Sequence, residues 1–316
     1  MKVKFWGVRG SIPSSLTADE VEDKIIEALQ GAHELKRSDP QALRSYLSRL
    51  PPGVRGTVGG NTSCIQVLAG PHLIVLDAGS GLHRLGLSLM EGECGRGEGT
   101  VHLFLTHLHW DHIQGFPFFA PLRVPGNRIF IYSLHEQTEE RLLEQQKPEH
   151  FPLLPSEIKA DMHFSLLERG GEISLGDVHI SNLPLKHPGD SYSYRIEYGR
   201  SCLVYATDGE YQNLDEASTR QYVNFFHEAD ALIFDAQYTY RQYYVLEEKK
   251  DWGHSSWFSG VELALQAGVK RLVLFHHDPS SSDGDILKIL ENTRQSLAPG
   301  HKCEVLVAYE GLEMEL

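Results

Sequence analysis

The sequence predicts a layered α/β protein, in which helices cover the faces of β-sheets. Short apolar runs rich in Val, Ile, Leu and aromatic residues recur along the chain, which is typical of strands. Stretches with the helical spacing of apolar residues lie between several of these runs, and such a mixture indicates layered α/β architecture. The 316 residues contain no tandem repeat and no linker-like segment. We therefore expect a single domain over residues 1–316.

Each predicted element has its own signal. The opening run KVKFWGV has strand character, and the later strand signals are CIQVLA, LIVLDAG, VHLFLTH, RIFIYS, VHISNLPLKH, CLVYATDG, ALIFDAQ, RLVLFHH and CEVLVAY. Apolar residues at helical spacing predict helices over residues 137–146, 217–227, 257–267 and 286–297.

Residues 14–56 interrupt this alternation and read as an N-terminal helical insertion between two strands. The polar stretch 17–49 combines good helix formers with apolar residues at helical spacing, which predicts two amphipathic helices. The segment LPPGVRGTVGGN then breaks the pattern with Pro and Gly. The apolar faces of these helices have to be buried somewhere. We expect them to pack over the functional site or across a dimer interface, or else against their own subunit.

The overall charge restricts the class of ligand. The chain has 29 Lys and Arg against 43 Asp and Glu, a formal net charge of -14. Extended nucleic acid is disfavoured as a partner, because binding to it relies on many Lys and Arg contacts to phosphates. A small phosphorylated substrate is compatible with this charge. No apolar run approaches the ~20 residues of a membrane span, and four dispersed cysteines without a CxxC motif are typical of a cytoplasmic protein.

Acidic residues and histidines follow five of the apolar runs, at the point where each predicted strand ends. In layered α/β folds the loops beyond strand ends form the ligand site, so five such ends can converge on one rim. The residues concerned are His107, His109, Asp111 and His112, then His187, Asp208 and Asp235, and finally His276 and His277.

The most crowded of these segments, FLTHLHWDHIQG, has the chemistry of a metal site. Residues two apart on an extended segment point the same way, so His107 and His109 can bind one cation together. Asp111 and His112 follow the turn and can face a second cation, and the two oxygens of Asp208 can bridge both. Imidazole and carboxylate suit zinc, and also manganese or iron. Two such ions ~3.5–4 Å apart activate water and stabilise an in-line displacement.

The pattern HxHxDH at residues 107–112 resembles the signature of the metallo-β-lactamase superfamily. GGNTSC and LDAGSG upstream, and LKHPG, ATDGE and LFHHDP downstream, extend the resemblance over nearly the whole chain outside the insertion. Within the superfamily the chain is most similar to the ribonuclease Z-like and cyclic-nucleotide phosphodiesterase branch, through IFDAQYT and GHSSWFSGVELALQAGVKRLVLFHH. The resemblance implies a four-layer αββα sandwich with a two-metal site at its edge.

The resemblance also implies roles for individual residues. Asp77, in LDAG, resembles the acid that orients metal ligands. Zinc is the expected metal, with manganese as an alternative. The implied ligands are His107, His109 and His187 for the first ion, Asp111, His112 and His276 for the second, and Asp208 as the bridge.

Two more positions match the family's catalytic groups. His254 matches a catalytic histidine that precedes the last conserved helix, and Asp235 matches the acid that orients it. The sequence has Ser-Ser where the family has Ser-Thr after this histidine, and FHHDP offers two histidines where one is needed. We take His276 as the ligand because it continues the strand directly, and His277 and Asp278 as candidate substrate contacts.

These assignments predict a two-metal phosphodiesterase. Asp111 serves in the reacting centre, and His254, held by Asp235, protonates the leaving oxygen. One alternative is a ribonuclease Z-like RNA 3′ endonuclease, and another is an acyl hydrolase for thioesters or lactones. The pair His254 and Asp235 disfavours the acyl hydrolase, because an alkoxide leaving phosphorus needs an acid more than a thiolate does. A non-catalytic binding module is disfavoured by the full ligand set.

The expected substrate is a small phosphodiester, most simply a 3′,5′-cyclic monophosphate, because the acidic balance disfavours a folded RNA. The resemblance further implies a homodimer. Candidates for stacking on a base are Tyr238, Tyr240, Tyr243, Tyr244 and Trp252, and candidates for phosphate contact are Arg9 and Arg195.

Overall fold

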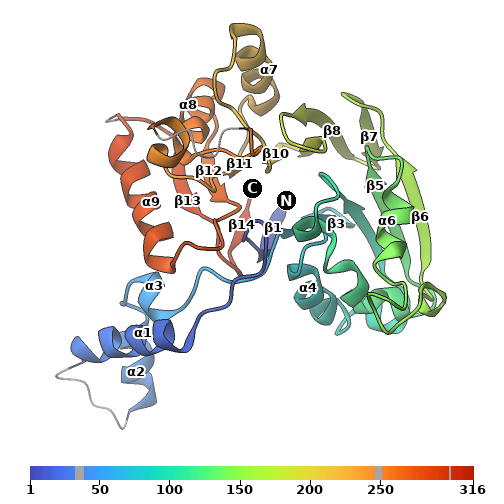
Figure 1. Cartoon of the computed structure of the whole chain (residues 1–316), viewed down its shortest axis with the longest axis horizontal. Helices are drawn as coiled ribbons and strands as arrows, with labels where there is room; N and C mark the ends of the chain where they lie inside the picture. Colours follow the sequence, from blue (N-terminus) through green and yellow to red (C-terminus); the bar gives the residue numbers. More distant parts are fainter. Residues whose placement is uncertain (33–38, 246–250, 299) are drawn as a thin grey trace.

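Two β-sheets face each other in the computed structural model, and helices cover both outer faces (Figure 1). The structure describes residues 1–32, 39–245, 251–298 and 300–316. Within these residues each sheet has seven strands, and the layers follow the order helix, sheet, sheet, helix. The α/β sandwich predicted from the sequence is therefore confirmed.

The first sheet has the strand order β14-β1-β2-β3-β4-β5-β6. Its pairs from β14 to β3 are antiparallel, and those from β3 to β6 are parallel. The strands are β1 (Lys2–Gly7), β2 (Cys64–Ala69), β3 (His72–Leu76), β4 (Thr100–Phe104), β5 (Arg128–Ser133), β6 (Asp161–Leu166) and β14 (Glu313–Glu315).

The second sheet has the order β13-β12-β11-β10-β9-β8-β7. Here the pairs from β13 to β10 are parallel, and those from β10 to β7 are antiparallel. The strands are β7 (Glu172–Leu175), β8 (Val178–Leu185), β9 (Ser191–Tyr198), β10 (Ser201–Ala206), β11 (Ala231–Asp235), β12 (Arg271–Phe275) and β13 (Glu304–Val307).

The main hydrophobic core lies between the sheets. The ring of Phe5 on β1 is 6.1 Å from that of Phe275 on β12, and the ring of Phe104 on β4 is 5.4 Å from that of Tyr194 on β9. All four side chains are fully buried. Truncating one such aromatic residue to alanine typically costs about 3–5 kcal/mol of unfolding free energy, so this core holds the two sheets in a fixed relation.

Helices complete the outer layers. In the first half of the chain, Leu82 and Leu85 of α4 and Leu142 of α6 join a second apolar cluster with Val75 and Leu103 of the first sheet. The helices of the body are α4 (Gly81–Leu89), α5 (Trp110–Ile113), α6 (Thr138–Glu144), α7 (Glu216–Phe226), α8 (Trp257–Ala267) and α9 (Asp283–Ser296). Short turns are η1 (Glu93–Arg96), η2 (Phe116–Phe118), η3 (Ala120–Arg123), η4 (Pro155–Glu157) and η5 (Arg241–Val245).

The four helices predicted for the body are confirmed as α6, α7, α8 and α9, with ends that shift by a few residues or not at all. The sequence reasoning missed α4, because Gly81 and Gly86 weaken its helical signal. It also missed β6, β7, β9 and β14. Among the described residues, no helix is both long and apolar enough to cross a membrane.

The predicted insertion contributes three helices between β1 and β2: α1 (Ala18–Gln30), α2 (Pro40–Leu47) and α3 (Pro52–Arg55). Residues 33–38 of the insertion lie outside the described residues. Figure 1 shows α1 and α2 projecting from the two-sheet body, beside α3. Lys24 ties α1 to the start of α9, since its Nζ atom lies 2.8 Å from Asp283 Oδ2.

The apolar face of α1 is exposed in the single chain. Val21, Ile25, Ile26 and Leu29 are between 42% and 59% exposed, and none of the residues described in α1 or α2 is buried. The predicted burial of these faces therefore does not occur within the described part of this subunit.

Candidate metal centre

Five strand ends meet at one edge of the sandwich. The segment after β4 in the first sheet carries His107, and it faces the segments after β8, β10 and β12 of the second sheet, which carry His187, Asp208 and His276. Asp235 is the last residue of β11. The convergence expected from the strand-end pattern is therefore present, and it joins residues that are up to 169 positions apart in the sequence.

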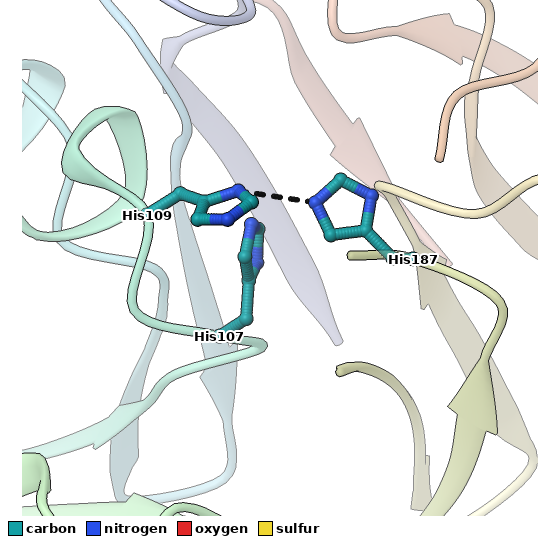
Figure 2. A group of neighbouring side chains, drawn as sticks. All are labelled: His107, His109 and His187. Atoms are coloured by element: carbon teal, nitrogen blue, oxygen red, sulfur yellow. Dashed lines mark hydrogen bonds between the residues drawn. The ribbon is translucent and has the colours of Figure 1, made fainter. Parts of the chain in front are cut away.

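Three imidazoles form the first cluster (Figure 2). Ligand atoms of His107, His109 and His187 all lie within 4.8 Å of one another, and His187 Nε2 is 3.1 Å from His109 Nδ1. The Nδ1 atom of His187 lies 2.8 Å from the carbonyl oxygen of Gly253, which turns Nε2 toward the other two rings. His107 is fully buried, whereas His109 is exposed and opens the cluster to solvent.

Two carboxylates and two imidazoles form the second cluster. Asp111, His112, Asp208 and His276 are all buried, and their ligand atoms also lie within 4.8 Å of one another. His112 Nε2 is 3.2 Å from Asp111 Oδ2 and 3.2 Å from Asp208 Oδ2. His276 Nε2 is 3.2 Å from Asp111 Oδ2 and 3.3 Å from Asp208 Oδ1.

Asp208 lies between the two clusters. Its Oδ1 atom is 3.8 Å from His107 Nε2 in the first cluster and 3.3 Å from His276 Nε2 in the second. Its Oδ2 atom accepts a hydrogen bond from Thr207 Oγ1 at 2.6 Å, which fixes the carboxylate plane. The carboxylate of Asp208 thus lies within 3.8 Å of ligand atoms from both clusters, which is the position that a bridging residue requires.

The electrostatics of the two clusters differ. Burial and the neighbouring His112 hold the pKa of His107 well below its usual value, so this ring is neutral and can act as a ligand. Burial opposes protonation of His276 too, but Asp208 and Asp111 outweigh it and raise the pKa of His276 to about 9. Similarly, burial disfavours the charge of Asp208, yet His112 and His276 keep its pKa well below the usual range. The second cluster therefore combines negative carboxylates with positive charge, which a cation would supply in place of protons.

Asp77 fixes one of the ligands from behind. It is fully buried, and its Oδ2 atom lies 2.8 Å from His112 Nδ1 and accepts a hydrogen bond from Tyr205 Oη at 2.8 Å. Its Oδ1 atom accepts one from the backbone N–H of Thr106 at 2.8 Å. These contacts turn His112 Nε2 toward the cluster, which is the geometry that the resemblance implied for an orienting acid.

His254 and Asp235 form a pair beside the second cluster. His254 Nδ1 is 2.8 Å from Asp235 Oδ2 and 3.7 Å from Asp208 Oδ1. Its ring stacks on that of His276 at 4.9 Å between centroids. Asp235 is fully buried and also accepts the backbone N–H of Asp208 at 3.1 Å. Because the carboxylate holds Nδ1, Nε2 is the atom of His254 that can meet a substrate.

Of the two predicted substrate contacts, His277 is buried elsewhere, whereas Asp278 is half-buried and stays a prediction. His276 has a left-handed backbone conformation, with φ of 59°, and this turn directs the next side chain away from the clusters. His277 is buried with Nε2 at 2.9 Å from the carbonyl oxygen of Ala308, and burial lowers its pKa to about 3. The Asp278 side chain instead accepts the backbone N–H of Ser280 at 2.7 Å. The structure thus favours His276 as the residue of this pair that belongs to the centre.

The two arginines suggested as phosphate contacts are structural. Arg9 is 3% exposed, and its guanidinium donates to the carbonyl oxygens of Gly59 and Ser281, each at 2.8 Å. Arg195 donates to the carbonyl oxygen of Phe225 at 3.0 Å. Both guanidinium groups satisfy backbone acceptors, so the predicted phosphate contacts are wrong for these side chains.

The aromatic residues before His254 divide into two groups. Tyr238 and Tyr243 are 2% and 0% exposed, which excludes them from stacking on a base, and Tyr244 Oη lies 2.7 Å from Ser259 Oγ. Tyr240 and Trp252 are 44% and 56% exposed. Of the five, Tyr240 and Trp252 are therefore exposed, and Tyr244 is half-buried.

The sequence reasoning missed a turn near the N-terminus that closes over the second cluster. The backbone N–H of Ser11 donates to Asp111 Oδ2 at 2.7 Å, although Ser11 has a left-handed φ of 63°. A Cβ atom on Gly10 would come within 2.4 Å of the His276 ring. The glycine in GVRGSIP was a signal for close approach of the backbone, but only the fold reveals which side chain it meets.

The donor atoms of the clusters fit divalent metal ions. His107 Nε2 is buried and has no hydrogen-bond partner among the described residues. Buried polar atoms in proteins are normally paired, and imidazole nitrogens with carboxylate oxygens are common ligands of zinc and related metals. The two groups of donors are therefore suited to hold cations.

Comparison with known proteins identifies the family. Residues 72–277 match the model of the β-lactamase superfamily domain. The ribonuclease Z of Prochlorococcus marinus (strain NATL2A) is 27% identical over 168 residues, which are 52% of this chain and 46% of that protein. The chain thus spans about half the length of the curated relatives it matches.

Solved structures share the fold over the whole chain. The metallo-β-lactamase fold protein YhfI from Bacillus subtilis has a TM-score of 0.66 at 18% identity, with 100% of this chain and 98% of that chain covered. Human tRNase Z, short form, has a TM-score of 0.58 at 18% identity, with coverage of 100% and 99%. Such a fold implies divalent metal ions, commonly zinc. Because the family model spans well over half of the chain, the protein belongs to the β-lactamase superfamily and has the metallo-β-lactamase fold that its HxHxDH motif indicated.

Proposed function

We propose that this protein is a metal-dependent hydrolase, and more specifically a two-metal phosphodiesterase. Zinc is the proposed native metal, with manganese as the alternative. When bound, the ions supply an activated water and stabilise negative charge on the phosphoryl oxygens. The proposed ligands are His107, His109 and His187 for one ion, Asp111, His112 and His276 for the other, and Asp208 for both.

Several residues of the chain prepare the ligands for this role. Asp77 holds Nδ1 of His112, and the carbonyl oxygen of Gly253 holds Nδ1 of His187, so the Nε2 atom of each ring is directed into the centre. Such contacts fix the tautomer and orientation of a ligating histidine. They support metal binding as the purpose of the clusters.

The observation that carries the proposal is the pair of His254 and Asp235. Asp235 is buried and lies 2.8 Å from His254 Nδ1, so it holds this nitrogen and leaves Nε2 to deliver a proton to the leaving group. An alkoxide leaving group on phosphorus needs such a general acid. An acyl hydrolase acting on a thioester expels a thiolate, which leaves without one. The pair therefore favours the phosphodiesterase over that alternative.

A ribonuclease Z-like RNA 3′ endonuclease is the second candidate. It is favoured by the relative of that name, which is 27% identical over half of this chain. Against it stand the net charge of -14 and the burial of Arg9, whose guanidinium is committed to the protein interior. We therefore propose a small phosphodiester as substrate, most simply a 3′,5′-cyclic monophosphate.

Asp208→Ala should lose metal and activity together. The purified wild-type protein should carry about two transition-metal ions per chain, and the variant should carry fewer because both ions lose a shared ligand. Metal content is measured by plasma mass spectrometry and activity with bis(p-nitrophenyl) phosphate. Asp215→Ala, an exposed N-cap residue of α7, is the matched control. Full occupancy and turnover in Asp208→Ala would exclude the bridging role.

His254→Ala should lower the rate by ~10²–10⁴ for a substrate with a poor leaving group, the usual contribution of general acid catalysis. The loss should be smaller for p-nitrophenolate, which leaves without a proton. Metal content should stay at the wild-type level, and the exposed His227→Ala should behave like wild type. Equal losses for both leaving groups would indicate that His254 only packs in front of α8.

Cyclic AMP and cyclic GMP should be turned over faster than a precursor transfer RNA is cleaved at the same enzyme concentration. The reason is the acidic chain, since RNA binding would rely on basic contacts and weaken steeply with salt. The measurement compares both reactions across a salt series. Efficient RNA processing that falls steeply with salt, without cyclic-nucleotide turnover, would replace the proposed function with the ribonuclease.

We also propose that the exposed face of α1 is covered in a homodimer. Light scattering should then give a mass near twice the 35.6 kDa of the chain. Ile25→Asp, at the centre of the apolar face, should lower this mass, whereas Glu22→Gln on the same helix should leave it unchanged. A wild-type mass of one chain would instead mean that the helices serve only their own subunit.

A further inference from the structure

Both backbone polar groups of Gly253 make contacts beside the metal centre. Its backbone N–H donates to Glu210 Oε2 at 3.4 Å, and its carbonyl oxygen lies 2.8 Å from His187 Nδ1. Its φ is 83°, and a Cβ atom would come within 2.2 Å of His187 Nδ1. The residue that follows is His254. Gly253 therefore lies between a proposed metal ligand and the proposed general acid.

Glu210 holds the N–H of Gly253 from a buried position. Its side chain is 1% exposed, and its Oε1 atom accepts a hydrogen bond from Lys186 Nζ at 2.7 Å. Its own backbone N–H donates to the carbonyl oxygen of Lys186 at 2.9 Å. Lys186 immediately precedes His187 and also reaches Asp251 Oδ1 at 3.1 Å. Glu210 thus connects three segments: the end of β8, the loop after β10 and the loop before α8.

We propose that Glu210 is a positioning residue that acts through Gly253 on both sides of the centre. By holding the N–H of Gly253, it fixes the position of this residue, whose carbonyl oxygen, in the next peptide unit, orients His187. Because His254 follows Gly253 directly, the same contact also fixes the position of His254 relative to Asp235. The effect on His187 concerns metal binding alone, whereas the effect on His254 rests on the proposed function.

The alternative is that Glu210 only completes an ion pair with Lys186. The chain offers a matched comparison, because Glu313 also accepts from a lysine, Lys4, at 2.7 Å. That pair joins β1 and β14, and the Glu313 side chain is 68% exposed. Glu313→Ala therefore removes a Lys–Glu contact of the same length without touching the centre.

The test compares Glu210→Ala, Glu210→Gln and Glu313→Ala with wild type. Zinc affinity is measured by competition with a chromogenic chelator, and rates are measured with a good and a poor leaving group. Glu210→Ala should lose about 10–100-fold in zinc affinity or rate, the usual effect of removing a group that orients a metal ligand. The rate loss should be larger for the poor leaving group, because His254 is displaced. Glu210→Gln should recover most of the zinc affinity and most of the rate, since its amide oxygen can still accept a hydrogen bond from the Gly253 N–H.

Glu313→Ala should match wild type in every readout. Gly253→Ala provides a second route to the same result, because the added Cβ displaces His187 while Glu210 stays intact. Circular dichroism checks that each variant is folded. Wild-type zinc affinity and leaving-group dependence in folded Glu210→Ala, or in folded Gly253→Ala, would overturn the inference. If wild type lacks phosphodiesterase activity, the proposed function fails, while the zinc affinities still decide the role of Glu210.

Discussion

The arrangement of the whole centre depends on the buried carboxylate of Asp208 among four imidazoles. Its oxygens lie between 3.2 and 3.8 Å from ring nitrogens of His107, His112, His276 and His254. A buried charge is costly unless it is paired and hydrogen-bonded. Thr207 donates a hydrogen bond to one oxygen of this carboxylate, and the imidazoles surround it. Asp235 accepts the backbone N–H of Asp208 and so fixes the position of the residue. The same cost explains why cationic partners, either protons or metal ions, are needed at this point.

Backbone strain is concentrated around this carboxylate. Asp77, Asp208 and His276 have φ values of 62°, 55° and 59°, and Ser11 has 63°. Left-handed conformations are uncommon for residues other than glycine and cost of order 1–3 kcal/mol each. Asp77 and His276 directly follow β3 and β12, and Asp208 is the second residue after β10. The sharp turn at each strand end aims the side chain across the edge of the sandwich, so the core between the sheets stabilises a geometry that the local sequence disfavours.

The sequence predicted those parts of the centre that depend on local pattern. The spacing of His107, His109, Asp111 and His112 is a single motif, and Asp208 could be located because it follows an apolar run. His276 could be preferred over His277 because it continues the strand directly, and the structure places it in the second cluster. Arg9 has the positive charge that a phosphate contact needs, but its side chain is buried and donates to carbonyl oxygens. Buried and exposed tyrosines before His254 could not be separated, since their burial is set by segments distant in sequence.

Contacts made through the backbone were beyond sequence reasoning. Ser11 reaches Asp111 through its N–H, and Gly253 reaches both Glu210 and His187 through its peptide groups. Their side chains give no sign of these roles, and the partners are between 43 and 100 positions away. The helix α4 was missed for a different reason. Its two glycines lower the helix propensity of the segment, and packing on the first sheet stabilises the helix nevertheless.

The most direct test of the two-metal account is anomalous diffraction from crystals of the zinc-loaded protein, recorded on both sides of the zinc absorption edge. The account predicts two peaks at one edge of the sandwich. One should lie among His107, His109 and His187, the other among Asp111, His112 and His276, with Asp208 contacting both. A single peak, or peaks held by other residues, would contradict it.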